Sequence, residues 1–209
     1  MNYQVQRENS EKMEVVIIKY NAGNILSVDY ALQRLGINPI ITDDHEKIKK
    51  ADKVIFPGVG EASTTMNYLK KHKLDKLIRE LKQPVLGICL GMQLMCKYSE
   101  EGNTECLGIF NESVKRFRTS EYKNFKVPHM GWNDIYNLKG KLFESIPDHS
   151  YVYFVHSYYV DIGEHTSSIC EYILPFSASL EYKNFYATQF HPEKSSKIGS
   201  TILQNFLKL

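Results

Sequence analysis

A cysteine bracketed by glycines at the end of a short apolar run most constrains what this chain can fold into. Residues 85–88 are too few for a helix and lead into Cys89, with Gly87 and Gly91 two residues to either side. An apolar run compatible with a helix, residues 90–96, follows at once. A strand that turns sharply into a helix, with a reactive side chain at the apex, has this pattern. The glycines permit the close backbone approach and the strain that such a turn requires.

The position of Cys89 favours a nucleophile. A helix beginning there directs its N-terminal dipole and free amide groups at the sulfur, which favours the thiolate and supplies donors for an oxyanion. The alternative is a buried structural cysteine at a strand end, the ordinary fate of this residue type. Gln93 lies one helical turn after Cys89, so its amide could face a substrate; a packing role is the alternative.

A second motif near the other end of the chain favours the catalytic interpretation. Residues 185–190 form an apolar, strand-like run that delivers His191 and Glu193, and Pro192 between them prevents a continuing helix. In this geometry His191 can take a proton from Cys89, and Glu193 can hold the imidazole in the right tautomer.

Together, Cys89 between its glycines and the His191-Pro192-Glu193 strand end resemble the class I (triad) glutamine amidotransferases. Within that family the chain is most similar to the glutaminase subunits of imidazole glycerol phosphate synthases. The similar segments are residues 18–28, 57–60, 127–133, 153–158 and 194–196. The opening loop departs from the family pattern, with Lys19 and Asn21-Ala22 where an aspartate and an extra glycine are expected.

The resemblance implies roles for residues around the triad. Backbone amides near Gly58 and Leu90 would hold the oxyanion, and Pro57-Gly58-Val59-Gly60 has the flexible backbone for it. The residues expected to bind substrate are Gly60, Gln93, Ser157 and Tyr158. The residues expected to contact a partner or line a channel are Pro128, His129, Met130, Gly131, Trp132, Tyr153 and Lys194; we name these seven the docking face.

The remaining histidines are weaker candidates for a catalytic base. His156 lies in an alternating aromatic strand and is predicted to be structural or to face a partner. His129 is ambiguous, and the resemblance places it at the interface. Four more stand in polar surroundings and are predicted to be solvated: His45, His72, His149 and His165.

The activity implied by the resemblance is hydrolysis of L-glutamine to glutamate and ammonia through a cysteine thioester, without a cofactor or metal. The ammonia would pass through a channel to a (β/α)-barrel cyclase subunit that makes imidazole glycerol phosphate and an aminoimidazole carboxamide ribotide in histidine biosynthesis. The nearest alternative is a paralogous glutaminase that supplies ammonia for nucleotide-sugar modification. More distant alternatives are an inactive partner-binding module and another cysteine hydrolase on the same fold.

Composition limits the other possibilities. The chain has 209 residues, enough for one domain with a substantial core, and its 26 basic and 24 acidic residues nearly cancel, so no general electrostatic case for nucleic acid or membrane binding arises. No apolar run approaches the ~18 residues of a membrane span. The four cysteines show no paired metal spacing and indicate a reducing compartment, by default the cytoplasm.

The order of apolar runs predicts an α/β fold. Strand-like and helical runs alternate through the first half, which indicates a doubly wound, mostly parallel sheet of the flavodoxin-like type that the family has. Residues 107–186 carry short aromatic and β-branched runs that predict antiparallel additions. The predicted strands are 15–18, 37–42, 53–56 and 85–88, and the predicted helices are 24–35, 68–81 and 199–207. We expect residues 1–12 to be a disordered extension and 13–209 to be one domain.

Overall fold

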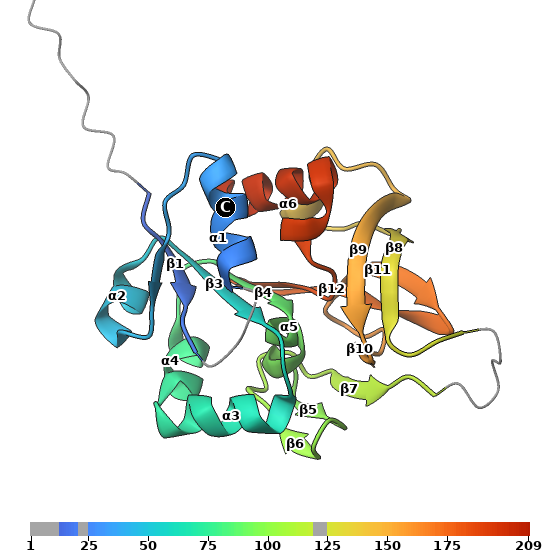
Figure 1. Cartoon of the computed structure of the whole chain (residues 1–209), viewed down its shortest axis with the longest axis horizontal. Coiled ribbons are helices and arrows are strands. Elements are labelled where there is room, and N and C mark those ends of the chain that lie inside the picture. The colour runs from blue at the N-terminus through green and yellow to red at the C-terminus, as the bar shows by residue number, and fades with distance from the viewer. Residues whose placement is uncertain (1–12, 21–24, 119–124) are drawn as a thin grey trace, which may run out of the picture.

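The computed structural model describes residues 13–20, 25–118 and 125–209 (Figure 1). The expected N-terminal extension and the departing loop at Asn21-Ala22 lie outside these residues. A parallel sheet organises the first half of the chain and confirms the predicted doubly wound fold. Its strands run in the order β2-β1-β3-β4-β13, an order typical of flavodoxin-like sheets. They are β1 (Val15–Ile18), β2 (Ile40–Thr42), β3 (Lys53–Gly58), β4 (Val85–Cys89) and β13 (Phe185–Thr188).

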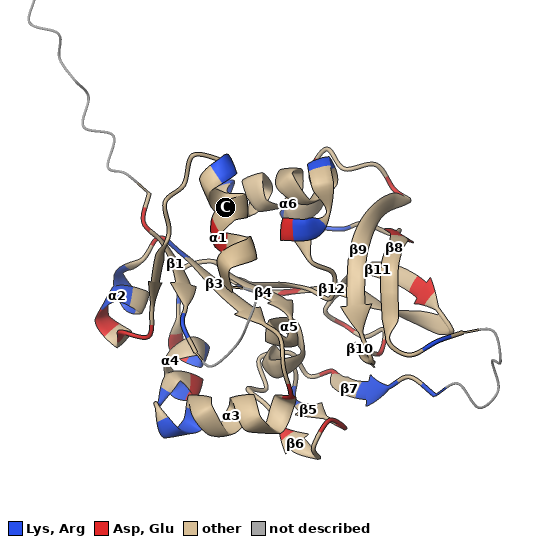
Figure 2. Ribbon diagram, in the orientation of Figure 1, with Lys and Arg blue, Asp and Glu red and all other residues tan. Residues whose placement is uncertain are grey.

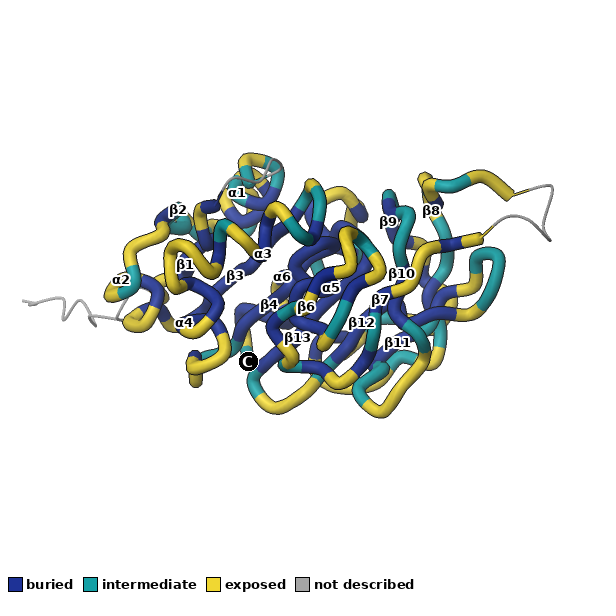
Figure 3. Tube along the Cα trace, turned by 90° about the horizontal axis from the view of Figure 1, so that it is seen from below, coloured by how far each residue is buried: buried dark blue, intermediate teal, exposed yellow. Residues whose placement is uncertain are grey.

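Helices cover both faces of this sheet because the strand residues alternate between two cores. In β1, Val16 and Ile18 belong to one apolar cluster, whereas Val15 and Ile17 belong to the other. The first cluster includes side chains of α2, α3, α4 and α5, and the second includes side chains of α1 and α6. The helices are α1 (Ile25–Arg34), α2 (His45–Lys50), α3 (Ala62–Lys71), α4 (Leu74–Glu80), α5 (Leu90–Met95) and α6 (Ser196–Lys208). Figure 3 shows the central strands buried between these layers.

The single helix predicted over residues 68–81 is wrong. The structure has two helices, α3 and α4, separated at His72 and Lys73. Lys73 adopts a left-handed conformation with φ of 57°, which ends the first helix and redirects the chain. This turn lets Leu69 and Leu74 reach the same core. The predicted strand over 37–42 is also shorter, because only Ile40–Thr42 pairs with β1.

The second half adds antiparallel strands, as predicted. β12 pairs with β13 and extends the sheet through β10, β7, β5 and β6, while β11 pairs with the other edge of β12. A separate antiparallel pair, β8 and β9, contributes Ile135, Val152 and Phe154 to the core shared with α6. The strands are β5 (Tyr98–Ser99), β6 (Thr104–Glu105), β7 (Ser113–Arg116), β8 (His129–Ile135), β9 (Ser150–His156), β10 (Tyr158–Val160), β11 (Thr166–Tyr172) and β12 (Leu174–Tyr182). Two 3-10 helices, η1 (Lys141–Phe143) and η2 (Pro192–Lys194), complete the described elements.

The carboxyl ends of three adjacent strands meet at one edge of the parallel sheet. Gly58 ends β3 and pairs with Cys89 at the end of β4, and β13 beside it leads to His191. Sites in open α/β sheets form at such edges. Basic and acidic residues are interspersed along the chain (Figure 2). None of the helices in the described part of the chain is long and apolar enough to cross a membrane.

Candidate active site

Cys89 stands at the apex of the predicted strand-to-helix turn. Its backbone has φ of 54° and ψ of −109°, a conformation that costs a non-glycine residue about 1–3 kcal/mol. The turn is tight because α5 packs directly against β3: a Cβ on Gly91 would lie 2.0 Å from the Phe56 carbonyl oxygen. The side chain of Cys89 is largely buried yet lines a cavity. Strain maintained at this position indicates that the turn serves to present the sulfur.

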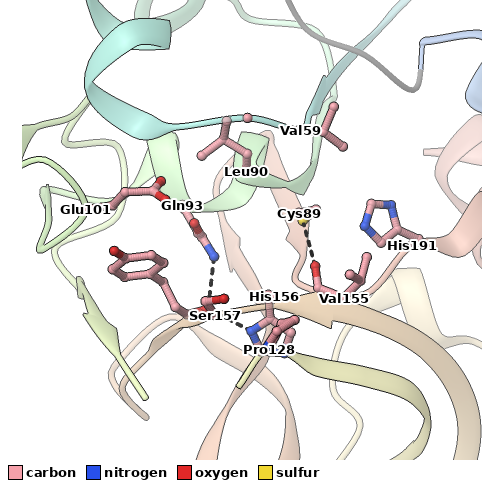
Figure 4. Close-up of a pocket in the computed structure, with 12 residues that line it drawn as sticks. Val59, Cys89, Leu90, Gln93, Glu101, Pro128, Val155, His156, Ser157 and His191 are labelled. Carbon is pink, nitrogen blue, oxygen red and sulfur yellow. Dashed lines mark hydrogen bonds between the residues drawn. The ribbon is translucent and has the colours of Figure 1, made fainter. Parts of the chain in front are cut away.

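His191 and Glu193 form a buried pair beside that cysteine. His191 Nδ1 lies 2.8 Å from Glu193 Oε1, and both side chains are excluded from solvent. The other ring nitrogen, Nε2, has no hydrogen-bond partner among the described residues, and the imidazole stands beside Cys89 at the cavity (Figure 4). The Nδ1 contact with the carboxylate fixes the ring orientation and leaves Nε2 available for proton transfer.

The electrostatics of this pair favour the imidazolium. Burial alone lowers the pKa of His191, but its interactions with Cys89, through charge and hydrogen bonding, and then those with Glu193 outweigh burial and raise the pKa to about 10. At neutral pH His191 is therefore protonated. The protonated imidazole can give its proton to a leaving group directly, without first taking a proton from another group.

A cavity of about 330 Å³ opens in front of the sulfur. The residues predicted to bind substrate all line it: Gly60, Gln93, Ser157 and Tyr158. Leu90, Glu101, Val155 and His156 complete much of its wall (Figure 4). The cavity thus lies between β9 and β10, from the second half of the chain, and the strand ends of the parallel sheet.

The end of β3 lies at the cavity beside the start of α5. Of the described residues at the end of β3, Val59 and Gly60 line the cavity, whereas Gly58 is buried behind them. A Cβ on Gly58 would lie 2.7 Å from both the Gly91 nitrogen and the Tyr20 hydroxyl oxygen. Gly58 therefore lets β3 approach the start of α5, and the oxyanion role of the amides near it stays a prediction. Leu90, the other predicted donor, begins α5 at the cavity wall.

Most of the predicted docking face is accessible, with one exception. Met130 is 63% exposed and Trp132 is 52% exposed on β8, while Tyr153 on β9 contacts Trp132 edge to face. Pro128 and Lys194 are exposed, and Gly131 is partly exposed. His129 is the exception. Its ring is buried and stacked on Tyr172, because side chains alternate along β8 and its own points inward.

Two other histidines, His156 and His165, have little exposure to solvent. His156 is buried and lines the cavity, where its ring packs against Phe176 and Phe117, so the predicted structural position agrees with the structure. The prediction that His165 is solvated is wrong. Its side chain is only 10% exposed, and Nδ1 lies 2.9 Å from Glu112 Oε2. This pairing joins positions far apart in sequence, so local polarity did not reveal it.

The sequence analysis did not identify Gln189 or Val155. Gln189 Nε2 lies 3.8 Å from the Cys89 sulfur, and the sulfur is also 3.8 Å from the Val155 carbonyl oxygen. A polar residue inside an otherwise apolar strand end was the available signal for Gln189. Nothing in the sequence could show a contact made by the backbone of Val155. Within the described ranges, no group of three or more His, Cys, Asp or Glu residues could hold a metal ion.

Comparisons with known proteins find similarity over nearly the whole chain. A family model described as "Glutamine amidotransferase class-I" matches residues 16–209. The chain is 62% identical over 197 residues to an imidazole glycerol phosphate synthase subunit HisH from Bacteroides fragilis, covering 94% of this chain and 100% of that relative. It is 60% identical to the subunit of the same name from Bacteroides thetaiotaomicron, with the same coverage. It is 44% identical to the one from Idiomarina loihiensis, covering 94% of this chain and 98% of the relative.

Solved structures show the same fold at low sequence identity. A protein from Thermoplasma acidophilum, described as part of a GMP synthase, has a TM-score of 0.72 at 21% identity, covering 94% of this chain and 93% of that one. PurLQS from Thermotoga maritima has a TM-score of 0.69 at 14% identity, covering 94% and 98%. These two likenesses concern the fold alone.

Proposed function

The chain belongs to the HisH family of class I glutamine amidotransferases, and on that basis we propose that Cys89, His191 and Glu193 carry out hydrolysis of L-glutamine to glutamate and ammonia. The observation that carries this assignment is the meeting of a strained cysteine and a buried histidine–carboxylate pair at one cavity. Cys89 ends β4, and the chain after the adjacent parallel strand β13 leads to His191 and then to Glu193 in η2.

The first step is attack by the Cys89 thiolate on the side-chain carboxamide carbon of glutamine. A sulfur–carbon bond forms, and the carbonyl electron pair moves to oxygen to give a tetrahedral oxyanion. We expect amides near Gly58 and at Leu90 to hold this charge, because Val59 and Leu90 line the cavity. Removing one such donor typically lowers the rate by about two to three powers of ten.

His191 then completes the two proton transfers. Its imidazolium gives a proton from Nε2 to the leaving nitrogen, so ammonia departs as the carbon–nitrogen bond breaks and a thioester remains. The neutral ring next removes a proton from water, whose oxygen attacks the thioester and releases glutamate and the thiolate. Glu193 keeps Nδ1 occupied throughout, so that Nε2 stays directed at the reacting atoms.

The ammonia is used by a partner subunit. HisH relatives are named as subunits of imidazole glycerol phosphate synthase, and the partner here is the (β/α)-barrel cyclase of that enzyme, in histidine biosynthesis. Free ammonia in neutral water is mostly protonated and not nucleophilic, which gives direct transfer a physical reason. The exposed Met130 and Trp132 on β8 supply apolar contact area for the barrel. We place this reaction in the cytoplasm, where the four unpaired cysteines remain reduced.

Replacement of the nucleophile tests the assignment. Cys89→Ala should abolish glutamate release while the complex with the barrel subunit still forms cyclised product from added ammonium, because that chemistry belongs to the partner. The measurements are glutamate release and product formation with either nitrogen source. Substantial glutaminase activity in the Cys89→Ala complex would overturn the role of Cys89. Loss of the ammonia-dependent reaction as well would indicate a docking or folding defect instead.

A further inference from the structure

A chain of hydrogen bonds runs through the interior from β8 to the Cys89 sulfur, and the mechanism above does not use it. Its members, in order, are Asn133, His129, His156, the Tyr158 carbonyl, Gln93 and Gln189. The four side chains between Asn133 and the sulfur are at most 6% exposed, so water does not compete for their polar groups. Each hydrogen bond in this chain therefore has a fixed donor and a fixed acceptor.

The Tyr158 carbonyl oxygen fixes that direction. It lies 3.0 Å from Gln93 Nε2 and 2.7 Å from His156 Nδ1. A carbonyl oxygen only accepts hydrogen bonds, so both side chains must donate to it. One backbone group thus determines the orientation of an amide on α5 and the tautomer of an imidazole on β9.

The branch through Gln93 ends at the nucleophile. Because Gln93 presents its NH₂ group, the contact of 2.9 Å to Gln189 requires that Gln189 accept with its Oε1. The NH₂ group of Gln189 is then turned toward the Cys89 sulfur, at 3.8 Å. Gln189 is fully buried, and its backbone amide is held by the Ala178 carbonyl at 2.8 Å.

The branch through His156 supports the same carbonyl from the other side. With Nδ1 donating, His156 Nε2 must accept from His129 Nδ1 at 3.0 Å, and His129 Nε2 is left to accept from Asn133 at 3.4 Å. Burial lowers the pKa of His129 to about 4 and, together with the neighbouring His129, lowers the pKa of His156 to about 3. Both rings are neutral at neutral pH, so the direction of this branch does not change there.

We propose that Gln189 stabilises the thiolate of Cys89 by donating a hydrogen bond to the sulfur, and that Gln93, the Tyr158 carbonyl and the His129–His156 pair position it. The other neutral contact to the sulfur, the Val155 carbonyl, can only accept and so favours the protonated thiol. Gln189 is the opposing donor. This inference rests on the proposed nucleophile but concerns its ionisation, not the turnover of glutamine.

The test is the pH dependence of Cys89 alkylation by iodoacetamide in the full-length protein. Alkylation follows the thiolate, and mass spectrometry of the Cys89 peptide separates this site from the other three cysteines. Gln189→Leu removes the donor, and Gln189→Glu replaces it with an oxygen of nearly the same shape. Both variants should raise the alkylation midpoint by about one pH unit, which corresponds to about tenfold slower alkylation below the midpoint. The shift should be at least as large for the glutamate, whose charge repels the thiolate.

A matched control is Gln83→Leu. Gln83 also donates a side-chain hydrogen bond, to the Ile48 carbonyl at 2.8 Å, but it lies on a surface away from the cavity. Its alkylation midpoint should equal that of the unaltered protein. Thermal melting of all variants shows whether each is folded, and Gln189→Glu keeps the test available if Gln189→Leu does not fold.

Two results would overturn the proposal. Unchanged midpoints in both Gln189 variants would show that the amide does not act on the sulfur. A lowered midpoint in Gln189→Leu would show that the amide oxygen, not the NH₂ group, faces the sulfur. Alkylation needs no glutamine, so failure of the unaltered protein to hydrolyse glutamine would contradict the proposed function separately.

Discussion

At the scale of single residues, the charge of Glu193 is one of the causes that keep His191 protonated to high pH. Glu193→Gln preserves an acceptor for Nδ1 but removes the negative charge that helps raise the His191 pKa to about 10. The raised pKa keeps the imidazolium present until the pH rises through about 10, so lowering it should bring the alkaline loss of activity to lower pH. We expect a shift of at least about one unit in the alkaline limb of kcat/KM. Glutamate release by the complex between pH 6 and 11 measures it, and an unmoved limb would refute the role of Glu193.

The triad could be predicted at this scale because its residue types and local spacing are unusual. Cys89 between glycines, and histidine and glutamate around a proline, are visible in the sequence alone. The contact of Gln189 with the sulfur was not predictable, since its direction depends on a carbonyl at Tyr158, distant in the chain.

At the scale of elements, the contact between α5 and β3 sets the position of the nucleophile. Gly91→Ala would place a methyl group 2.0 Å from the Phe56 carbonyl oxygen, a backbone atom that cannot move aside without shifting the strand. We expect a loss of about 1–3 kcal/mol in the free energy of unfolding together with a large loss of glutaminase activity. Gly36→Ala is the control: its Cβ meets nothing within 4 Å, and its φ of 81° costs about 1 kcal/mol without affecting activity. The free energy of unfolding is measured with denaturant, and activity as glutamate release. If both quantities were equal in Gly91→Ala and Gly36→Ala, the role given to the contact between α5 and β3 would be contradicted.

A second element, the β8–β9 pair, carries the exposed part of the docking face. Trp132→Ala removes a side chain that is 52% exposed and contacts Tyr153, so the fold should lose little stability. Binding of the barrel subunit should weaken by about tenfold or more, since exposed aromatic anchors dominate interfaces. Titration calorimetry measures the affinity, and Tyr30→Ala, an exposed aromatic residue on α1, gives a comparison. Equal affinities of Trp132→Ala and the unaltered protein for the barrel subunit would show that the partner binds at another surface.

Element boundaries followed the sequence pattern where the apolar spacing was unbroken. The spacing of Leu74, Leu77 and Ile78 correctly indicated a helix, but it gave no sign that Lys73 would leave the helical region. A lysine with positive φ has no local signature, and the requirement that α3 and α4 both cover the sheet imposes it.

At the scale of the whole molecule, the site is assembled from both halves of the chain, and this suggests how a partner could control it. Val59 and Gly60 form one wall of the cavity, and residues of β9 and β10 form the other. Gly60 has φ of 120°, so the peptide there can rotate at low cost. We expect the isolated protein to release glutamate slowly, and the barrel partner with its nucleotide ligand to raise the rate. The coupling free energy between two binding sites is typically on the order of 1–3 kcal/mol, and the effect on the rate of glutamate release can be larger. Equal rates for the isolated protein, for its complex with the barrel, and for the complex with ligand would leave a constitutive glutaminase.

The alternation of strand-like and helical runs was enough to predict the parallel half. It did not show that β13, the last strand, enters the sheet beside β4 and brings His191 to Cys89. That pairing depends on the global packing of two cores, which local periodicity does not encode.

The backbone conformation of Cys89 has a consequence for how this sequence changes over generations. With φ of 54° and ψ of −109°, the backbone there has a conformation that glycine adopts with the least strain. Catalysis therefore favours cysteine at this position, whereas stability favours glycine. If glutamine hydrolysis ceased to matter to its host, a Cys89→Gly change would remove the strain rather than damage the fold. A related chain with glycine at this position would therefore lack the nucleophile while keeping an unstrained turn.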